Sequence, residues 1–188
     1  MNQSSNIRIR KARPEDVPGL VRLWREMWDL HAASDPRFRL APDGEQAMDA
    51  WIRQHVESPT SCVLVADSVW EGAPSPDRGG LAGRGTEAPP TANPAPLGYI
   101  LGMVLENPPV TPDRYFGLVS EIAVRADRRR GGIGGKLLDD LMEWFRLLRV
   151  AYVETNVSVR NPAARSFWRK RGFGEFLERL RVEMRHDG

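Results

Sequence analysis

Nine residues near the middle of the chain combine four glycines with four basic side chains. Positions 128 to 136 are Arg-Arg-Arg-Gly-Gly-Ile-Gly-Gly-Lys, and apolar residues then recur at helical spacing as far as Phe145. Glycines in a first helical turn cost stability, so several of them indicate that a ligand approaches the backbone. The first amides of a helix bind anions, and arginines add bidentate phosphate donors. The pattern predicts a phosphate or pyrophosphate site, against the alternative of a turn beside a solvated run of charge.

A single carboxylate, Glu121, lies in the apolar segment that precedes this loop. The segment from Leu118 to Val124 otherwise contains apolar or small residues and is typical of a buried strand. Burial raises the pKa of a carboxyl group toward neutrality and suits it to accept a proton from an amine. The alternative is that Glu121 faces solvent or pairs with an arginine.

The spacing of the glycines excludes two common phosphate-binding motifs. The loop lacks the G-x-G-x-x-G of dinucleotide-binding folds and the Gly-Lys-Ser/Thr ending of the P-loop. Arg129-x-x-Gly132-x-Gly134, after a strand that ends at Val124, resembles instead the acetyl-CoA signature of the GCN5-related N-acetyltransferases, the GNAT family.

A second segment resembles another signature of the same family. It runs Asn161-Pro-Ala-Ala-Arg-Ser-Phe-Trp168-Arg-Lys-Arg-Gly172-Phe173 and is predicted to form a helix with Asn161 and Gly172 as its caps. Trp168 occupies the position where the family commonly has a tyrosine, which protonates the departing CoA thiolate. Because an indole does not give up its proton, Tyr152, Ser166 or water would replace that acid.

The resemblance implies an enzyme that transfers an acetyl group directly from acetyl-CoA to a primary amine of a small molecule or peptide. Glu121 is the candidate catalytic base, and the backbone amide of Ala123 or Val124 is the candidate group for polarising the thioester carbonyl. The first helix pair would form a wall of the amine site, with Trp28, His31 and Phe38 as candidates. The candidate cofactor-binding residues are Ile122, Ala123, Val124, Arg129, Arg130, Gly131, Gly132, Ile133, Gly134, Gly135, Lys136 and Asn161.

The predicted elements alternate between strands and helices, which is typical of an α/β domain. The resemblance implies a GNAT-like mixed, mostly antiparallel central sheet with helices on both faces, in which the fourth and fifth strands splay apart around pantetheine. Residues 1–188 are predicted to form one domain, with a disordered Gly/Pro-rich insertion at about 71–96. Strands are predicted at 7–12, 61–67, 97–105, 115–125 and 150–159, with one or two more in 173–184, and helices at 14–28, 44–56, 133–145 and 162–171.

Composition narrows the classes of protein. The 188 residues are 41% hydrophobic without a membrane-spanning run or signal peptide, so a cytoplasmic protein without a membrane partner is expected. Cys62, the only cysteine, excludes an internal disulfide and a cysteine metal cluster, and its strand-like surroundings favour a buried hydrophobe over a nucleophile. No metal site is predicted.

Two further classes of protein are left open, one because of charge and one because of the tryptophan at 168. The net charge is only +2, but arginines cluster around the loop, so an Arg-rich nucleic-acid-associated protein is a third and less favoured hypothesis. The main alternative to the enzyme is a non-catalytic acyl-CoA sensor on the same fold, which the tryptophan at 168 suggests. The predicted partners are acetyl-CoA and an amine and not nucleic acid, and a homodimer is left open.

Overall fold

The computed structural model describes residues 7–68 and 95–184 of the chain. These residues form two compact units, within 1–156 and 157–188, which are described separately below. Of the predicted insertion at about 71–96, all but the last two residues lie outside the described part.

The first unit is built on one five-stranded sheet. The strands lie in the order β1-β2-β3-β4-β5, with antiparallel neighbours except for the parallel pair β4 and β5. The predicted α/β class with a mixed, mostly antiparallel sheet is therefore confirmed. The elements are β1 (Ile7–Lys11), α1 (Val17–Ser34), α2 (Gly44–Glu57), β2 (Ser61–Ser68), β3 (Gly98–Glu106), β4 (Tyr115–Val124), α3 (Ile133–Leu147) and β5 (Val153–Thr155), with 3-10 turns at Pro14–Asp16 and Ala126–Arg128.

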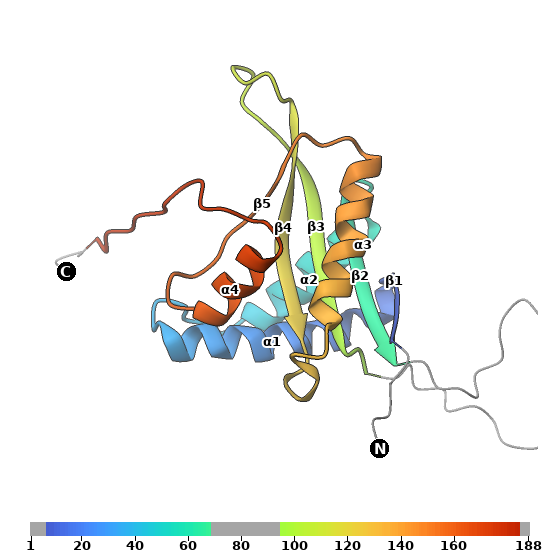
Figure 1. Ribbon diagram of the computed structural model, residues 1–188. Helices are drawn as coiled ribbons and strands as arrows, with labels where there is room; N and C mark the ends of the chain where they lie inside the picture. Colours follow the sequence, from blue (N-terminus) through green and yellow to red (C-terminus); the bar gives the residue numbers. More distant parts are fainter. Residues whose placement is uncertain (1–6, 69–94, 185–188) are drawn as a thin grey trace, which may run out of the picture. The chain divides into compact units, whose positions relative to one another are not determined.

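Helices cover both faces of this sheet. Helices α1 and α2 lie on one face and α3 lies on the other (Figure 1). On the first face, Tyr99 and Leu101 of β3 pack with the buried residues of α1, and all of them lose nearly all contact with solvent. On the second face, a Cβ atom on Gly117 would come within 2.6 Å of the Phe145 ring, so glycine there lets α3 pack closely on the sheet.

Strand β4 departs from regular pairing at the positions that matter for the predicted site. Leu101 of β3 pairs with Glu121 whereas Gly102 pairs with Val119, so Ser120 is an extra residue that forms a β-bulge. On the opposite edge, β5 pairs with β4 only from Gly117 to Val119. From residue 120 to residue 124, β4 has no strand partner on that edge within the described part of the chain, which agrees with the predicted splay.

The second unit contains one helix, α4 (Pro162–Lys170). The Asn161 side chain accepts a hydrogen bond from the Ala164 amide at 2.9 Å, and Gly172 takes a φ of 87° after the helix. Both predicted caps are therefore confirmed. Trp168 is buried and packs edge-on against Phe167 and Phe173, with ring centroids 5.1 and 4.8 Å away.

Three sequence-based boundaries are wrong. The helix predicted at 14–28 continues to Ser34, because Ala32 and Ala33 favour helix. The strand predicted at 150–159 shrinks to β5. No strand forms within 173–184, where the apolar side chains of Phe176, Leu177, Leu180, Val182 and Met184 are 74% to 83% exposed. Alternating apolar residues fit a strand, but a strand also needs a neighbour for its backbone hydrogen bonds.

The described residues were compared with what a membrane-spanning helix and a metal site require. Within residues 7–68 and 95–184, no helix is long and apolar enough to cross a bilayer. The same residues contain no group of three or more His, Cys, Asp or Glu side chains that could hold a metal ion.

Candidate functional site

The glycine-rich loop gives α3 an open N-terminal end. Gly132 precedes the helix with a φ of 81°, a left-handed conformation that favours glycine, and Arg130 also has a positive φ of 64°. No side chain caps this end, and the first turn carries no acidic residue. A Cβ atom on Gly132 would meet no protein atom within 4 Å, so its backbone is accessible. Unpaired amides at a positive helix end fit a phosphate group.

The basic residues of this loop have different roles. Arg129 donates from Nε to the carbonyl oxygen of Val124 at 3.0 Å and thereby connects the loop to the end of β4. Arg125 pairs with Asp127 at 2.6 Å. Within the described residues, Arg130 and Lys136 form no ion pair, so these two side chains are the ones available to a phosphate.

The open edge of β4 presents backbone groups beside this loop. The Arg125 amide donates to the Leu97 carbonyl oxygen on the β3 side at 2.9 Å. Because successive residues of a strand point their backbone groups to opposite sides, Ile122 and Val124 turn theirs toward the open edge, while Ala123 pairs with Tyr99 of β3. Of the predicted strand residues, Ile122 and Val124 are therefore the ones that could hydrogen-bond an extended ligand.

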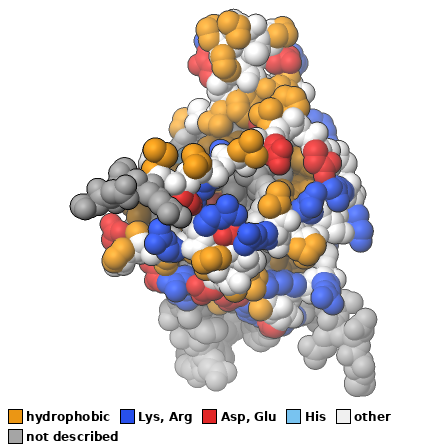
Figure 2. All heavy atoms as spheres, turned by 90° about the vertical axis from the view of Figure 1, so that its left-hand side faces the viewer, with side chains coloured by type: hydrophobic (Ala, Val, Ile, Leu, Met, Phe, Trp, Pro, Cys, Tyr) orange, Lys and Arg blue, Asp and Glu red, His pale blue; other side chains and the backbone are white. Residues whose placement is uncertain are grey.

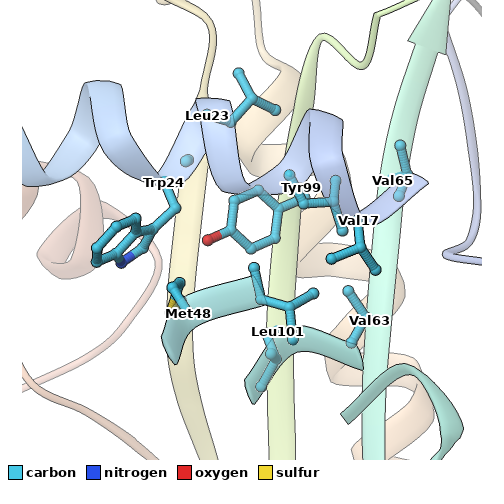
Figure 3. Close-up of a cluster of buried hydrophobic side chains, with 11 residues drawn as sticks. Val17, Leu23, Trp24, Met48, Val63, Val65, Tyr99 and Leu101 are labelled. Atoms are coloured by element: carbon cyan, nitrogen blue, oxygen red, sulfur yellow. The ribbon is translucent and has the colours of Figure 1, made fainter. Parts of the chain in front are cut away.

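Glu121 lies on the face of the sheet that α1 and α2 cover. Burial raises the pKa of its carboxyl group from its ordinary 4.5 to about 7. It is half-buried and forms no ion pair within the described part of the chain, so the alternative in which Glu121 pairs with an arginine does not hold. On the same face, burial and the negative charge of Glu121 raise the pKa of Tyr99 well above its usual range. The Tyr99 hydroxyl has no hydrogen-bond partner and lies on the Trp24 side of its ring (Figure 3).

An aromatic wall formed by Trp24, Trp28, His31 and Phe38 lies along α1 and the segment that follows it. Ring centroids are 5.3 Å apart for Trp24 and Trp28, 5.8 Å for Trp28 and Phe38, and 5.1 Å for His31 and Phe38. Burial lowers the pKa of His31, which keeps its imidazole neutral near pH 7. The structure thus brings together Trp28, His31 and Phe38, the three residues predicted for the amine site.

Sequence reasoning missed Tyr99 and Trp24. The signal for Tyr99 was present, since it is the only side chain with a hydrogen-bonding group in the apolar run from Leu97 to Leu105. In the sequence, Trp24 is one of several apolar residues at helical spacing and carries no further signal. Its contacts with Trp28 depend on side-chain directions that periodicity does not give.

Tyr152 and Cys62 of the first unit have surroundings that do not suit a catalytic role. The Tyr152 hydroxyl donates to the Asn107 side chain at 3.0 Å and its ring stacks on Phe116, near the paired end of β4. Tyr152 is therefore a poor replacement for the missing acid. Cys62 is buried, which raises the pKa of its thiol to about 11 and disfavours a nucleophilic role. Asn161, Ser166 and Trp168 belong to the second unit.

Two features of the surface concern other possible binding sites. An open hollow of about 450 Å³ is lined by Arg25, Leu40, Ala41, Pro42, Glu45 and Gln46, none of which was predicted for the site. On the face shown in Figure 2, Lys and Arg side chains are interspersed with Asp and Glu, so that face is not uniformly basic. A uniformly basic surface is the usual mark of a nucleic-acid interface.

Comparison with known families shows which family this fold belongs to. The profile described as the acetyltransferase (GNAT) family matches residues 24–173, which is most of the chain. The protein therefore belongs to the GNAT family of acetyltransferases. No curated protein sequence gives a significant match.

Solved structures with low sequence identity share the fold. A mutant of the BH1408 protein from Bacillus halodurans has a TM-score of 0.73 at 18% identity, covering 94% of this chain and 99% of its own. The aminoglycoside N-acetyltransferase AAC(6')-Iy in complex with CoA has a TM-score of 0.68 at 12% identity, covering 99% of both chains. A predicted acetyltransferase with acetyl-CoA from Clostridium acetobutylicum has a TM-score of 0.68 at 14% identity, covering 95% and 96%.

Proposed function

We propose that this protein transfers the acetyl group of acetyl-CoA directly to a primary amine of a small molecule or a peptide. The observation that carries the proposal is the position of Glu121, a largely buried carboxyl group with a pKa of about 7. It lies in the strand whose open edge leads into the uncapped, glycine-rich start of α3. Family membership supports acetyl transfer as the reaction.

The residues at this edge fit acetyl-CoA. The amides from Gly131 to Gly135 would donate hydrogen bonds to the pyrophosphate, with the Arg130 and Lys136 side chains adding positive charge. Arg129 would act mainly by holding the loop against β4, given its bond to Val124. The backbone of Ile122 and Val124 would hold the pantetheine arm.

Glu121 would take the proton that the attacking amine must lose. A general base works best when its pKa is close to the working pH, which holds for a carboxyl group with a pKa of about 7. Acetyl-CoA, when bound, supplies the thioester. Of the two amides predicted to polarise the thioester carbonyl, Ala123 pairs with β3, so the Val124 amide at the open edge would take this role. Water would protonate the departing thiolate.

A non-catalytic acyl-CoA sensor is the second candidate. The observation that favours it is Trp168, which stands at the family's tyrosine position and is buried against Phe167 and Phe173. A sensor would bind acetyl-CoA without releasing CoA in the presence of any amine.

A CoA-release assay against a panel of amines tests the proposal. Glu121→Gln should lower kcat by about 100- to 10,000-fold, as loss of a general base does, and leave the acetyl-CoA Kd from calorimetry unchanged. Glu143→Gln is the matched control, because Glu143 is exposed on α3 and pairs with Arg146. Full activity of Glu121→Gln from pH 6 to 9 would contradict the role of base, and binding of acetyl-CoA without turnover on any amine would favour the sensor.

A further inference from the structure

The hydroxyl group of Tyr99 is a buried polar group without a partner. Tyr99 is 0% exposed, and within the described residues its hydroxyl forms no hydrogen bond. A buried hydroxyl without a partner is destabilising, and a phenylalanine ring would fill the same space without that cost. Because solvent does not reach this hydroxyl, its partner must be a group of the protein itself.

Strand pairing places Tyr99 beside Glu121. Tyr99 of β3 pairs with Ala123 of β4, and Leu101 pairs with Glu121. Tyr99 and Glu121 are therefore diagonal neighbours on the face of the sheet that α1 and α2 cover. Diagonal neighbours in an antiparallel pair lie about 7 to 8 Å apart, within reach of an aromatic and a long side chain. Ala123, directly opposite Tyr99, carries only a methyl group, so no large side chain of β4 stands between the two.

The two side chains have complementary chemistry. Burial and, after it, the negative charge of Glu121 raise the pKa of Tyr99 well above its usual range. The phenol therefore keeps its proton at neutral and moderately alkaline pH. A protonated phenol can donate a hydrogen bond, and an ionised carboxylate can only accept one.

Other titratable or charged groups also lie on the elements packed around Glu121. On the two covering helices the buried positions are apolar or glycine, and burial is what raises the pKa of Glu121. The His31 ring lies against Phe38, two helical turns beyond Trp24, whereas the Tyr99 hydroxyl lies on the Trp24 side of its ring (Figure 3). The groups are Arg22, Arg25, Glu26, Asp29 and His31 on α1, Glu45, Asp49, Arg53, His55 and Glu57 on α2, Glu106 on β3 and Glu154 on β5.

We propose that Tyr99 is a positioning residue for Glu121, whose ionised carboxylate accepts a hydrogen bond from the Tyr99 hydroxyl. This inference rests on the proposed function, in which Glu121 is the base, and deepens it. The bond stabilises the carboxylate more than the neutral acid, so it increases the fraction of Glu121 that is ready to take a proton from the amine. It also directs one carboxylate oxygen toward β3 and leaves the other for the amine.

Tyr99→Phe removes the hydroxyl, keeps the ring and tests this bond in a pH-rate profile. It should raise the pKa of Glu121 by about 0.5 to 1 unit, because a hydrogen bond to a charged group is lost. With the best acceptor from the amine panel, kcat/KM relative to the wild type at the same pH should be about 3- to 10-fold lower at pH 6. The ratio should return to about 1 at pH 9, where Glu121 is ionised in both proteins. An equal loss at both pH values would overturn the inference, because it would show only a displaced ring.

Tyr115→Phe is the matched control for this experiment. Tyr115 belongs to the same strand as Glu121, but it is 45% exposed and its ring lies beside the Arg114 guanidinium. Its pH-rate profile should coincide with that of the wild type. A shift as large as that of Tyr99→Phe would overturn the assignment to Tyr99.

Urea denaturation at a series of pH values gives a reading that does not depend on activity. Folding raises the pKa of Glu121, so the free energy of unfolding falls as the pH rises from 4.5 to the folded-state pKa. In Tyr99→Phe this fall should continue for about 0.5 to 1 pH unit beyond the point where it ends in the wild type. The same comparison in a Glu121→Gln background should show no such extension and cancels the titration of His31 and His55. Parallel curves in the wild-type background would overturn the inference.

A second substitution tests the bond in the opposite direction. Replacing the tyrosines by 3-fluorotyrosine, a more acidic phenol, keeps the hydroxyl and makes it a stronger donor, so the pKa of Glu121 from urea denaturation should fall. No shift, or an upward shift, would overturn the inference even if Tyr99→Phe did not fold. The proposed function fails separately, when Glu121→Gln keeps full activity, and the two denaturation experiments then still decide whether Tyr99 bonds Glu121.

Discussion

Glu121→Gln should stabilise the protein at alkaline pH while it removes activity. Folding raises the pKa of Glu121 from 4.5 to about 7, because burial disfavours the charged carboxylate. Below pH 4.5 the group is neutral in both states and imposes no cost. As the pH rises from 4.5 to about 7, the unfolded chain loses the proton first, so the free energy of unfolding falls.

The size of the effect follows from the two pKa values. A difference of roughly 2.5 pH units corresponds to about 3 kcal/mol, at about 1.36 kcal/mol per unit. Glutamine resembles the neutral acid and does not ionise. Glu121→Gln should therefore be more stable than the wild type by up to about 3 kcal/mol at pH 8, and the two should converge near pH 4.5.

Urea denaturation of both proteins at a series of pH values measures this difference. The control is Glu143→Gln, whose exposed carboxyl group lies far along α3 and should show no comparable gain at pH 8. Equal stability of Glu121→Gln and the wild type at pH 8 would refute the reasoning that Glu121 is buried without a compensating charge. A pH-rate profile gives an independent reading, because the inflection of wild-type kcat/KM near pH 7 should be lost in the variant.

Three further predictions concern other residues. Replacing Gly132 and Gly134 together by valine should lower acetyl-CoA affinity at least about 10-fold in calorimetry, because side chains there obstruct phosphate and strain the φ of 81° at Gly132; unchanged affinity in a folded protein would refute the site. Gly117→Ala should cost about 1 to 3 kcal/mol in denaturant unfolding, because the new methyl would lie 2.6 Å from the Phe145 ring; an unchanged midpoint would show that α3 moves freely. Cys62 should react with a thiol reagent only on unfolding, given its pKa of about 11, and rapid labelling of the native protein would contradict its burial.

Local patterns in the sequence predict much of the first unit. Periods of two and of 3.6 residues locate four of the strands and two of the three helices of this unit within a few residues, and they locate α1 but not its C-terminal end, because they record which face of each element is buried. The open start of α3 is also predictable from the sequence. The left-handed conformation of Gly132 and the absence of a side-chain cap depend on neighbouring residues and not on a distant segment. The raised pKa of Glu121 also followed from its apolar neighbours.

Tertiary structure alone decides which side chains meet. Tyr99 comes near Glu121 because β3 pairs with β4 in one register, with a bulge at Ser120 that no local pattern announces. The aromatic wall depends on how the side chains of Trp28 and His31 are directed toward Phe38, which lies beyond the end of α1. For residues 173–184 the sequence pattern predicts an element that the structure lacks, because their alternating apolar residues indicate a strand that does not form. Strand pairing needs hydrogen bonds from a distant segment, and a local pattern specifies the buried face without specifying that partner.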